Sequence, residues 1–352
     1  MIVKKKRSFG KLPEHRLKSY IPIIIGLLLF TGRSFAQNNQ VLQLDLAKAT
    51  EMAMKNNMGI QAQQLNLQSG QMLKKSAFEL PKTEVGAQLG QYNSLNQDNN
   101  FNLRQSIPFP TVFSARSGLY NSMVQSDQLG LQASQNEITW RVQVAYGNIL
   151  YLQEVQKQLV KLDSFYTDFA KAAALKYSTG ESNLLEKTTA ETKHAELQQF
   201  MVQNTSQLTV AYSELKMLTG YTGEISIADN SIQPIQINPT LDTSLISNNP
   251  ALKNLYQQAI IADKNKKLEL AQTLPDFSIG YFSQTLIGYQ TIDNNDVYFG
   301  SGKRFTGITL GVGIPLTFFS NSAKIRSIEL QKQSLQRNAD YGKLQLQTQL
   351  KQ

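Results

Sequence analysis

The feature that most constrains this chain of 352 residues is an internal repeat with a large period. Four landmarks occur twice in the same order: an Asn pair, a Lys pair, a Leu-Pro step and an Ile-Pro step. They stand at 56–57, 74–75, 80–81 and 107–108, and again at 248–249, 266–267, 274–275 and 314–315. A repeat of this kind usually determines the architecture. The chain is therefore predicted to contain two copies of one unit.

Each copy is predicted to be a helix, two strands and a second helix. In the first copy, a helix over 46–80 is capped by Asp45 and ended by Pro81. Apolar residues then alternate with polar ones over 85–89 and 101–107, the period of a strand with one apolar face. The second copy repeats the pattern with a helix over 249–274 and strands over 277–281 and 308–314, separated by a polar loop near 293–296. Helix resumes at about Ser322.

The second helix of the first copy is predicted to be very long. Residues 111–177 contain no Pro, and apolar residues from Ile149 to Phe169 recur at steps of three and four, a narrow coiled-coil seam. A helix of roughly 65 residues would be about 100 Å long. Glycines within this helix, at 118, 130 and 147, are candidate breaks. Gly180 then interrupts the pattern, and a helix over 184–218 is expected to run back as the other arm of an antiparallel hairpin.

Residues 1–36 have the pattern of a secretory signal peptide. A basic stretch precedes the apolar run 21–30, and Ser34 and Ala36 place small residues before a cleavage site at Gln37. The run is shorter than the about 20 residues that a spanning helix needs. An uncleaved membrane anchor is the alternative. Export of the mature chain from the cytoplasm is predicted.

The remaining organisation follows from the repeat. Residues 37–220 form the first copy, 221–248 a Gly- and Pro-rich linker, and 249–352 a second, incomplete copy. In the first copy, 112 residues follow the Ile-Pro step up to Gly220, whereas in the second copy 37 residues follow this step (352 − 315). If the copies were equal, about 75 residues of a longer protein would be absent at the C-terminus.

Composition excludes several function classes. There is no Cys, and the two His exclude multi-His metal sites. The net charge of +9 belongs mainly to residues 1–36, which hold eight basic and one acidic residue. The rest has 27 basic and 25 acidic residues (35 − 8 and 26 − 1), so nucleic-acid binding is not indicated. No nucleotide-binding Gly-x-x-x-x-Gly-Lys loop is present. No enzymatic activity and no cofactor are predicted.

The four predicted strands match the 9–11 residues of bilayer-crossing strands. Four strands cannot close a membrane barrel, because the smallest have about eight and open edges in hydrocarbon leave backbone groups unpaired. Identical chains must therefore supply the rest of the wall, and three copies would give twelve strands. The alternative is a structural or adhesive coiled-coil protein of the periplasm or cell surface.

The turn Tyr177-Ser178-Thr179-Gly180-Glu181-Ser182-Asn183-Leu184-Leu185 resembles the Tyr-x-x-Gly-x-x-x-x-Leu turn of TolC-like outer-membrane efflux proteins. Ala145-Tyr146 and the two X-Pro steps at 274–275 and 314–315 also match places used by that family, over about residues 44–352. The resemblance implies a mainly α fold with β-hairpins, in which long antiparallel coiled-coil helices and four membrane strands per chain assemble as a trimeric α-barrel/β-barrel.

The same resemblance implies a function. The chain would be the outer-membrane channel of a tripartite RND-type efflux system in a Gram-negative cell, embedded in outer-membrane lipid. As a homotrimer it would dock a periplasmic adaptor (membrane fusion) protein and an inner-membrane pump. The adaptor-contact tip would comprise Tyr177, Gly180, Glu181, Leu184 and Leu185. A type I secretion exit duct is the alternative within the family, and the cargo is not indicated. The absent second tip would leave autonomous channel function in doubt.

Overall fold

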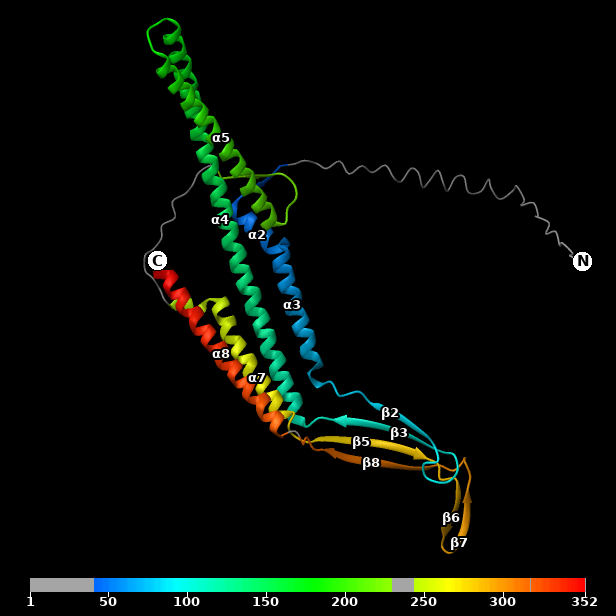
Figure 1. Ribbon diagram of the computed structural model, residues 1–352. Helices are drawn as coiled ribbons and strands as arrows, with labels where there is room; N and C mark the ends of the chain where they lie inside the picture. Colours follow the sequence, from blue (N-terminus) through cyan, green and yellow to red (C-terminus); the bar gives the residue numbers. More distant parts are fainter. Residues whose placement is uncertain (1–40, 230–243, 317, 352) are drawn as a thin grey trace, which may run out of the picture.

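The computed structural model describes residues 41–229, 244–316 and 318–351. The predicted signal peptide lies outside the described residues, as does the part of the predicted linker over 230–243. The described chain is elongated, with a helical hairpin at one end and a β-sheet at the other (Figure 1). Among the helices of these described ranges, none is long and apolar enough to cross a membrane.

The predicted single helix over 46–80 is wrong, because it is two α-helices and a short 3-10 turn. These are α2 (Leu46–Asn56), α3 (Met58–Lys75) and η2 (Ser76–Phe78). The break falls at Asn57, whose ψ of 123° lies outside the helical region and whose side chain accepts hydrogen bonds from the N–H groups of Gly59 and Ile60. An Asn that caps in this way favours a new start over continuation.

The long helix is confirmed, and its candidate glycine breaks are wrong. Helix α4 (Pro110–Ser178) is continuous over 69 residues, and α5 (Leu184–Thr219) runs back beside it. At Gly130 an added Cβ would lie 3.7 Å from the side chain of Gln63 and 3.8 Å from that of Asn254. The helices that carry these side chains, α3 and α7, flank α4, and this packing offsets the about 1 kcal/mol that glycine costs inside a helix.

Four helices lie in a row in the order α3, α4, α7, α8 (Figure 1). Helix α7 (Pro250–Ala271) packs on α4 and on α8 (Phe318–Lys351). Three ion pairs join α7 to α8, with N–O distances of 2.7 or 2.8 Å. They are Lys266–Glu329, Lys332–Asp263 and Lys324–Glu269. Because these side chains are partly exposed, each pair contributes little to stability, and the three together help to set how α7 and α8 align.

The sheet contains four antiparallel strands in the order β2-β3-β5-β8. They are β2 (Glu84–Gly90), β3 (Asp98–Ile107), β5 (Asp276–Gln284) and β8 (Phe305–Gly313). The four predicted strands are thus confirmed; each is longer than predicted, and β8 ends one residue before the predicted end at 314. Helix α3 leads toward the edge strand β2, and the edge strand β8 leads into α8, so helices and strands follow the same lateral order (Figure 1).

The sequence prediction missed two small sheets. Strands β6 (Gly288–Ile292) and β7 (Asn295–Phe299) form a hairpin beyond the main sheet, within the predicted polar loop. Strands β1 (Leu42–Leu44) and β4 (Ile225–Ile227) pair in parallel near the base of α5, and the short α6 (Ser244–Asn248) precedes α7. These pairings join segments that no local pattern connects.

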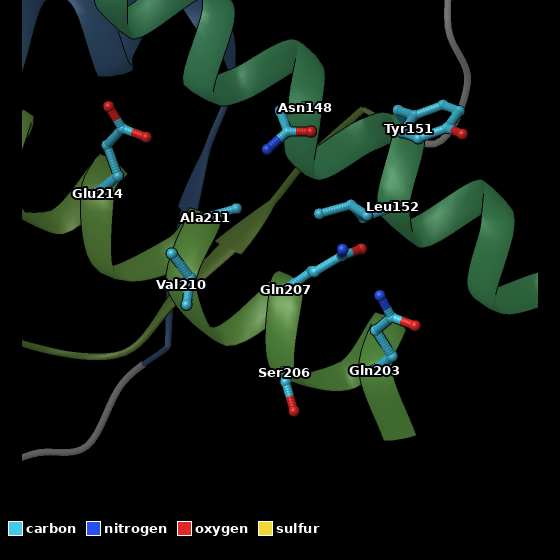
Figure 2. A pocket seen from close by; sticks show the side chains of 9 residues that line it. All are labelled: Asn148, Tyr151, Leu152, Gln203, Ser206, Gln207, Val210, Ala211 and Glu214. Atoms are coloured by element: carbon cyan, nitrogen blue, oxygen red, sulfur yellow. The ribbon is translucent and has the colours of Figure 1, made fainter. Parts of the chain in front are cut away.

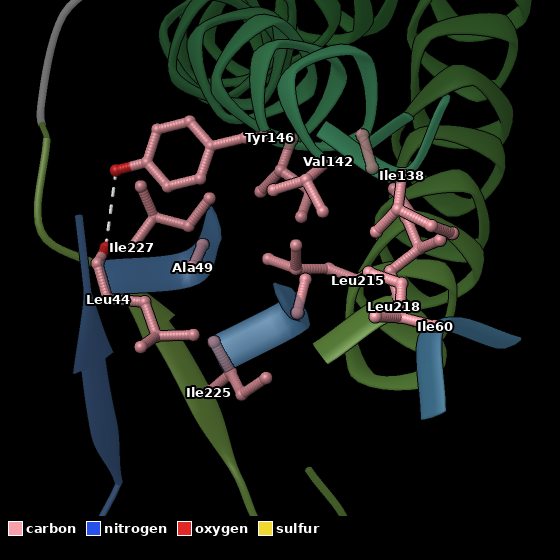
Figure 3. Close-up of a cluster of buried hydrophobic side chains, with 14 of the residues drawn as sticks. Leu44, Ala49, Ile60, Ile138, Val142, Tyr146, Leu215, Leu218, Ile225 and Ile227 are labelled. Carbon is pink, nitrogen blue, oxygen red and sulfur yellow. Dashed lines mark hydrogen bonds between the residues drawn. The ribbon is translucent and has the colours of Figure 1, made fainter. Parts of the chain in front are cut away.

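The main hydrophobic core lies where α2, α4, α5 and the β1–β4 pair meet (Figure 3). Val142, Ile149 and Leu215 are fully buried there. The buried Tyr146 hydroxyl contacts the Leu44 carbonyl at 3.2 Å and donates to the Asp229 carboxylate at 2.7 Å. Burial, then the neighbouring carboxylate, raises the pKa of Tyr146 far above its usual range. The core thus ties the first described strand to the middle of α4, at the base of the hairpin.

Candidate functional site

The turn between α4 and α5 forms the tip of the hairpin, far from the sheet (Figure 1). Gly180 has a φ of +78°, and the N–H of Glu181 donates to the Lys176 carbonyl at 2.9 Å, as in a Schellman helix end. Asn183 then caps α5 by accepting from the Glu186 N–H at 2.9 Å. Glycine and asparagine are the residues that this tight helix-to-helix turn requires.

A groove of about 500 Å³ lies beside this turn, between the last turns of α4 and the first turns of α5. Its floor is mainly apolar. The α4 side contributes Phe169, Ala172, Ala173 and Lys176, and the α5 side Ser182, Leu185, Glu186, Thr189 and Ala190. Phe169 and Leu185 are 50% and 73% exposed. The small Ala and Thr side chains between them leave room for a side chain from outside.

The predicted tip residues differ in their positions. Of the five, only Leu185 lines the groove. Tyr177 is exposed beside it, with the Lys187 ammonium 5.4 Å from its ring centroid. Gly180 and Glu181 form the turn, and Leu184 is exposed at the start of α5. Sequence reasoning missed the α4 wall from Phe169 to Lys176, although its spacing of three and four residues was a readable signal.

The stalk below the tip is poorly covered. The buried residues of α4 all lie between Val112 and Leu152, and none is buried from there to its end at Ser178. Exposed apolar residues along this stretch include Leu162, Phe165 and Phe169. A separate groove of about 550 Å³ lies nearer the base of the hairpin (Figure 2). Between α4 and α5 it is lined by polar side chains, such as Gln203 and Gln207, and by Tyr151 and Val210.

Asn204 places a buried polar side chain in the α4–α5 interface, beside the second groove. The residue is 4% exposed, and its amide donates to the Leu152 carbonyl at 3.1 Å and to Gln156 Oε1 at 2.7 Å. Its own Oδ1 is buried and has no hydrogen-bond partner among the described residues. A buried asparagine at a seam position fixes the register of two helices at a cost in stability.

The sheet at the opposite end has one apolar and one polar face. Cross-strand register places Val85, Leu103, Tyr281 and Ile308 side by side. All are exposed, Val85 by 81%, and so are the other apolar residues of that face. They are Ala87, Leu89, Phe101, Ile107, Phe277, Ile279, Leu310 and Val312. The other face carries mainly Asn, Gln, Ser, Thr and Gly. Its charged residues are Glu84, Asp98, Arg104 and Asp276, and it also holds Phe282 and Phe305.

Comparison with known proteins finds structural likeness only. No protein-family model matches the chain, and no curated protein sequence matches it significantly. The structure is similar to that of CusC, described in terms of transmembrane channel formation, with 15% identity and a TM-score of 0.67 over 90% of this chain and 77% of that one. It is also similar to the CmeC outer membrane channel of Campylobacter jejuni, with 14% identity and a TM-score of 0.67 over 85% and 68%.

A third similar structure is the outer membrane protein VceC of Vibrio cholerae, with 16% identity and a TM-score of 0.65 over 85% of this chain and 75% of that one. At these identities the likeness concerns the fold. The predicted TolC-like fold, mainly α with long antiparallel helices and β-hairpins, is confirmed.

Proposed function

We propose that this chain is the outer-membrane channel subunit of a tripartite, RND-type efflux system and acts as a passive exit duct. Three copies would combine their sheets into a twelve-stranded wall in outer-membrane lipid and their helices into a periplasmic tube. Transport through such a duct requires no chemical step, and the partner pump would supply the energy. The division into a first copy over 37–220, a linker over 221–248 and a second copy over 249–352 belongs to this proposal.

The observation that carries the proposal is the exposed apolar face of the sheet. Twelve apolar side chains from all four strands form one surface with no cover from the described helices. A surface of this size is far larger than isolated exposed apolar residues on a soluble protein. Hydrocarbon is its natural environment, whereas the polar face suits a water-filled lumen. A soluble adhesive coiled coil would have no use for such a face.

Two open sheet edges and the exposed upper part of the α4–α5 hairpin, beyond Leu152, support the proposed assembly of three copies. Among the strands that the structure describes, β2 and β8 each pair on one side only. In hydrocarbon an unpaired edge costs several kcal/mol for each backbone group, so both edges require partners. The groove at the tip is proposed as the contact for the helical hairpin of a periplasmic adaptor, with Leu185 in its floor and Tyr177, Gly180, Glu181 and Leu184 around it.

Dye release from liposomes tests the conduit. Purified protein reconstituted into vesicles that contain a small polar fluorophore is expected to release it, whereas protein-free vesicles retain it. Vesicles with correctly inserted protein that remain sealed to the dye would contradict the proposal.

A second experiment tests the tip. In cells, Leu185→Asp is expected to reduce efflux, because a charge in an apolar groove opposes docking of an apolar partner. The same variant should release dye from liposomes at the unmodified rate. Val202→Asp, a matched change at an exposed site on α5 outside the groove, should leave efflux unchanged. Equal efflux from all three proteins would contradict the role of the groove.

A further inference from the structure

The apolar face of the sheet ends in a charged residue at the end that lies far from the helices (Figure 1). Alternation along β8 places Ile308, Leu310 and Val312 on this face, where all three are exposed. The same alternation brings Thr306, and then Arg304 directly before the strand, to this face. The apolar face is therefore bordered by a polar rim that contains an exposed arginine.

The guanidinium of Arg304 is held in place by side chains and backbone of two neighbouring strands. Its Nε donates to Ser283 Oγ at 2.6 Å, and its Nη2 donates to the Ser283 carbonyl. Its Nη1 donates to Asn99 Oδ1 at 2.7 Å. Its central carbon also lies 5.2 Å from the centroid of the Phe101 ring. Because these contacts fix the side chain, little conformational freedom remains to be lost when a ligand binds.

The positive charge of Arg304 is not neutralised by these contacts. Both acceptor residues are uncharged, and none of the ion pairs among the described residues includes Arg304. Asp98, which lies on the opposite face of the sheet, is 2% exposed and already accepts three hydrogen bonds from its own surroundings. Lys303, the residue before Arg304, is exposed and adds a second positive charge.

The guanidinium also has donors to offer. An arginine side chain carries five N–H groups, and three of those of Arg304 make the bonds to Ser283 and Asn99. The other two have no partner in the described part of the chain. A fixed cation with two open N–H groups suits an anionic oxygen ligand, and phosphate matches the planar fork of arginine well.

The height of the apolar face places this cation at the level of lipid headgroups. Arg304 and Val312 are eight positions apart (312 − 304), which corresponds to about 27 Å along an antiparallel strand. The apolar band of a membrane β-sheet is about 25 Å tall. When hydrocarbon covers Ile308, Leu310 and Val312, the stem of Arg304 lies against the apolar surface and its charged group reaches the headgroups.

We propose that Arg304 binds the phosphate of an anionic lipid headgroup in the outer leaflet of the membrane, while the chains of that lipid lie on the apolar face below it. This inference rests on the proposed function for the position of the sheet in the outer membrane. It adds a lipid site, which conduction through the duct does not require. A free phosphate offers the same oxygens, but the exposed apolar residues beside Arg304 favour a ligand that also has hydrocarbon chains.

The contacts of Arg304 also clamp β3 and β5 to the start of β8, and this second role has a different readout. A clamp without a ligand contributes to the thermal stability of the sheet and leaves lipid affinity unchanged. A lipid site changes the affinity for phosphorylated lipid. Measuring both quantities on the same variants separates the two roles.

Lipid titration followed by native mass spectrometry tests the proposal on the full chain in mild non-ionic detergent. The probes are lipid A, which is phosphorylated, and the same lipid after enzymatic removal of its phosphate. The unmodified protein is expected to bind lipid A about tenfold more tightly, the difference that a hydrogen-bonded charge pair gives. Arg304→Gln should lose this preference. Arg304→Lys should retain part of it, because lysine keeps the charge without the fork.

Arg104→Gln is the matched control. Arg104 is also exposed and also donates to a serine of β5, with Nη2 3.2 Å from Ser278 Oγ, but it lies on the polar face. This variant removes the same charge from the other side of the sheet, so it should keep the tenfold preference. A loss as large as that in Arg304→Gln would show a general effect of net charge and would overturn the assignment.

Three other results would contradict the proposal. Equal affinities of the unmodified protein for the two lipids would refute it, and this comparison requires no variant that folds. A tenfold preference that survives in Arg304→Gln, with a lowered unfolding temperature, would make Arg304 a clamp alone. Complete displacement of lipid A by an excess of inorganic phosphate would indicate a site for free anions instead of a lipid.

These outcomes are distinct from those for the conduit. Dye release by a protein without a preference for phosphorylated lipid would refute the lipid site and leave the duct standing. An Arg304-dependent preference in a protein that releases no dye would refute the duct and leave the lipid site standing.

Discussion

The substitution Asn204→Leu is predicted to stabilise the hairpin, although it removes two hydrogen bonds. Loss of the bonds to Leu152 and Gln156 costs about 2 kcal/mol, at about 1 kcal/mol each. Removing the unpartnered buried Oδ1 recovers about 2 kcal/mol, within the 1–3 kcal/mol range for such groups. Burying a leucine side chain adds about 2 kcal/mol. The net effect is a stabilisation of about 2 kcal/mol.

Hydrogen exchange measures this effect locally, without unfolding the whole assembly. In detergent, backbone amides of α4 and α5 around residues 152 and 204 should exchange roughly 30-fold more slowly in Asn204→Leu. Ser206→Ala is the control, since Ser206 is exposed and its hydroxyl bonds only the Val202 carbonyl. Its effect should stay within about 0.5 kcal/mol. Unchanged or faster exchange in Asn204→Leu would refute the reasoning, because the two donated bonds would then outweigh the unpaired oxygen.

Two further predictions concern backbone strain and pH. Gly180→Ala and Gly220→Ala both force a side chain into positive φ, but only Gly220 is also crowded, with the Asn56 carbonyl oxygen 3.0 Å from an added Cβ. The backbone strain alone should cost each variant about 1–2 kcal/mol of stability. Because of the added crowding, Gly220→Ala should lower the temperature at which protease cleaves the protein clearly more than Gly180→Ala does. Equal decreases in this temperature would contradict the geometry. The hydrogen bond from Lys332 holds the pKa of Asp263 below its usual range, so this pair stabilises the fold fully above about pH 4 and is lost as pH falls through the lower folded-state pKa. Asp263→Asn should weaken this acid sensitivity in a circular dichroism titration, and an unchanged acid transition would contradict it.

The periodic parts of the fold were predictable from sequence. Period-two alternation found all four strands of the main sheet, and the apolar seam with its missing prolines found α4 and α5. These signals are strong because each element buries or exposes one face along its whole length. The internal repeat also predicts that the second copy has the same order of helices and strands as the first.

The errors arose where local and tertiary effects compete. Asn57 looks like any polar residue of a helix, but its capping geometry starts a new one. Gly130 looks like a break, although neighbouring helices pack closely around it. The β6–β7 hairpin was missed because its strands have five residues each and its turn uses Asp293 and Asn294 at positive φ, without the Asn-Gly signal. The β1–β4 pair joins three-residue strands that lie far apart in the sequence, and no local pattern indicates such a pair.

The candidate site likewise has one part that the sequence predicts and one part that depends on how the helices pack. The tip turn was readable because Gly180 and Asn183 have backbone roles that few other residues perform. The groove beside it was not predicted, because the spacing along α4 does not show which residues of α5 lie opposite. Phe169 and Leu185 lie on different helices, and the hairpin turn places them in one groove.

The central claim is that identical chains complete one another's membrane wall. The most direct measurement is the mass of the complex extracted from membranes in mild detergent, by native mass spectrometry. The account predicts a complex of three chains that requires detergent to stay in solution. A single folded chain that is stable in aqueous buffer without detergent would contradict it.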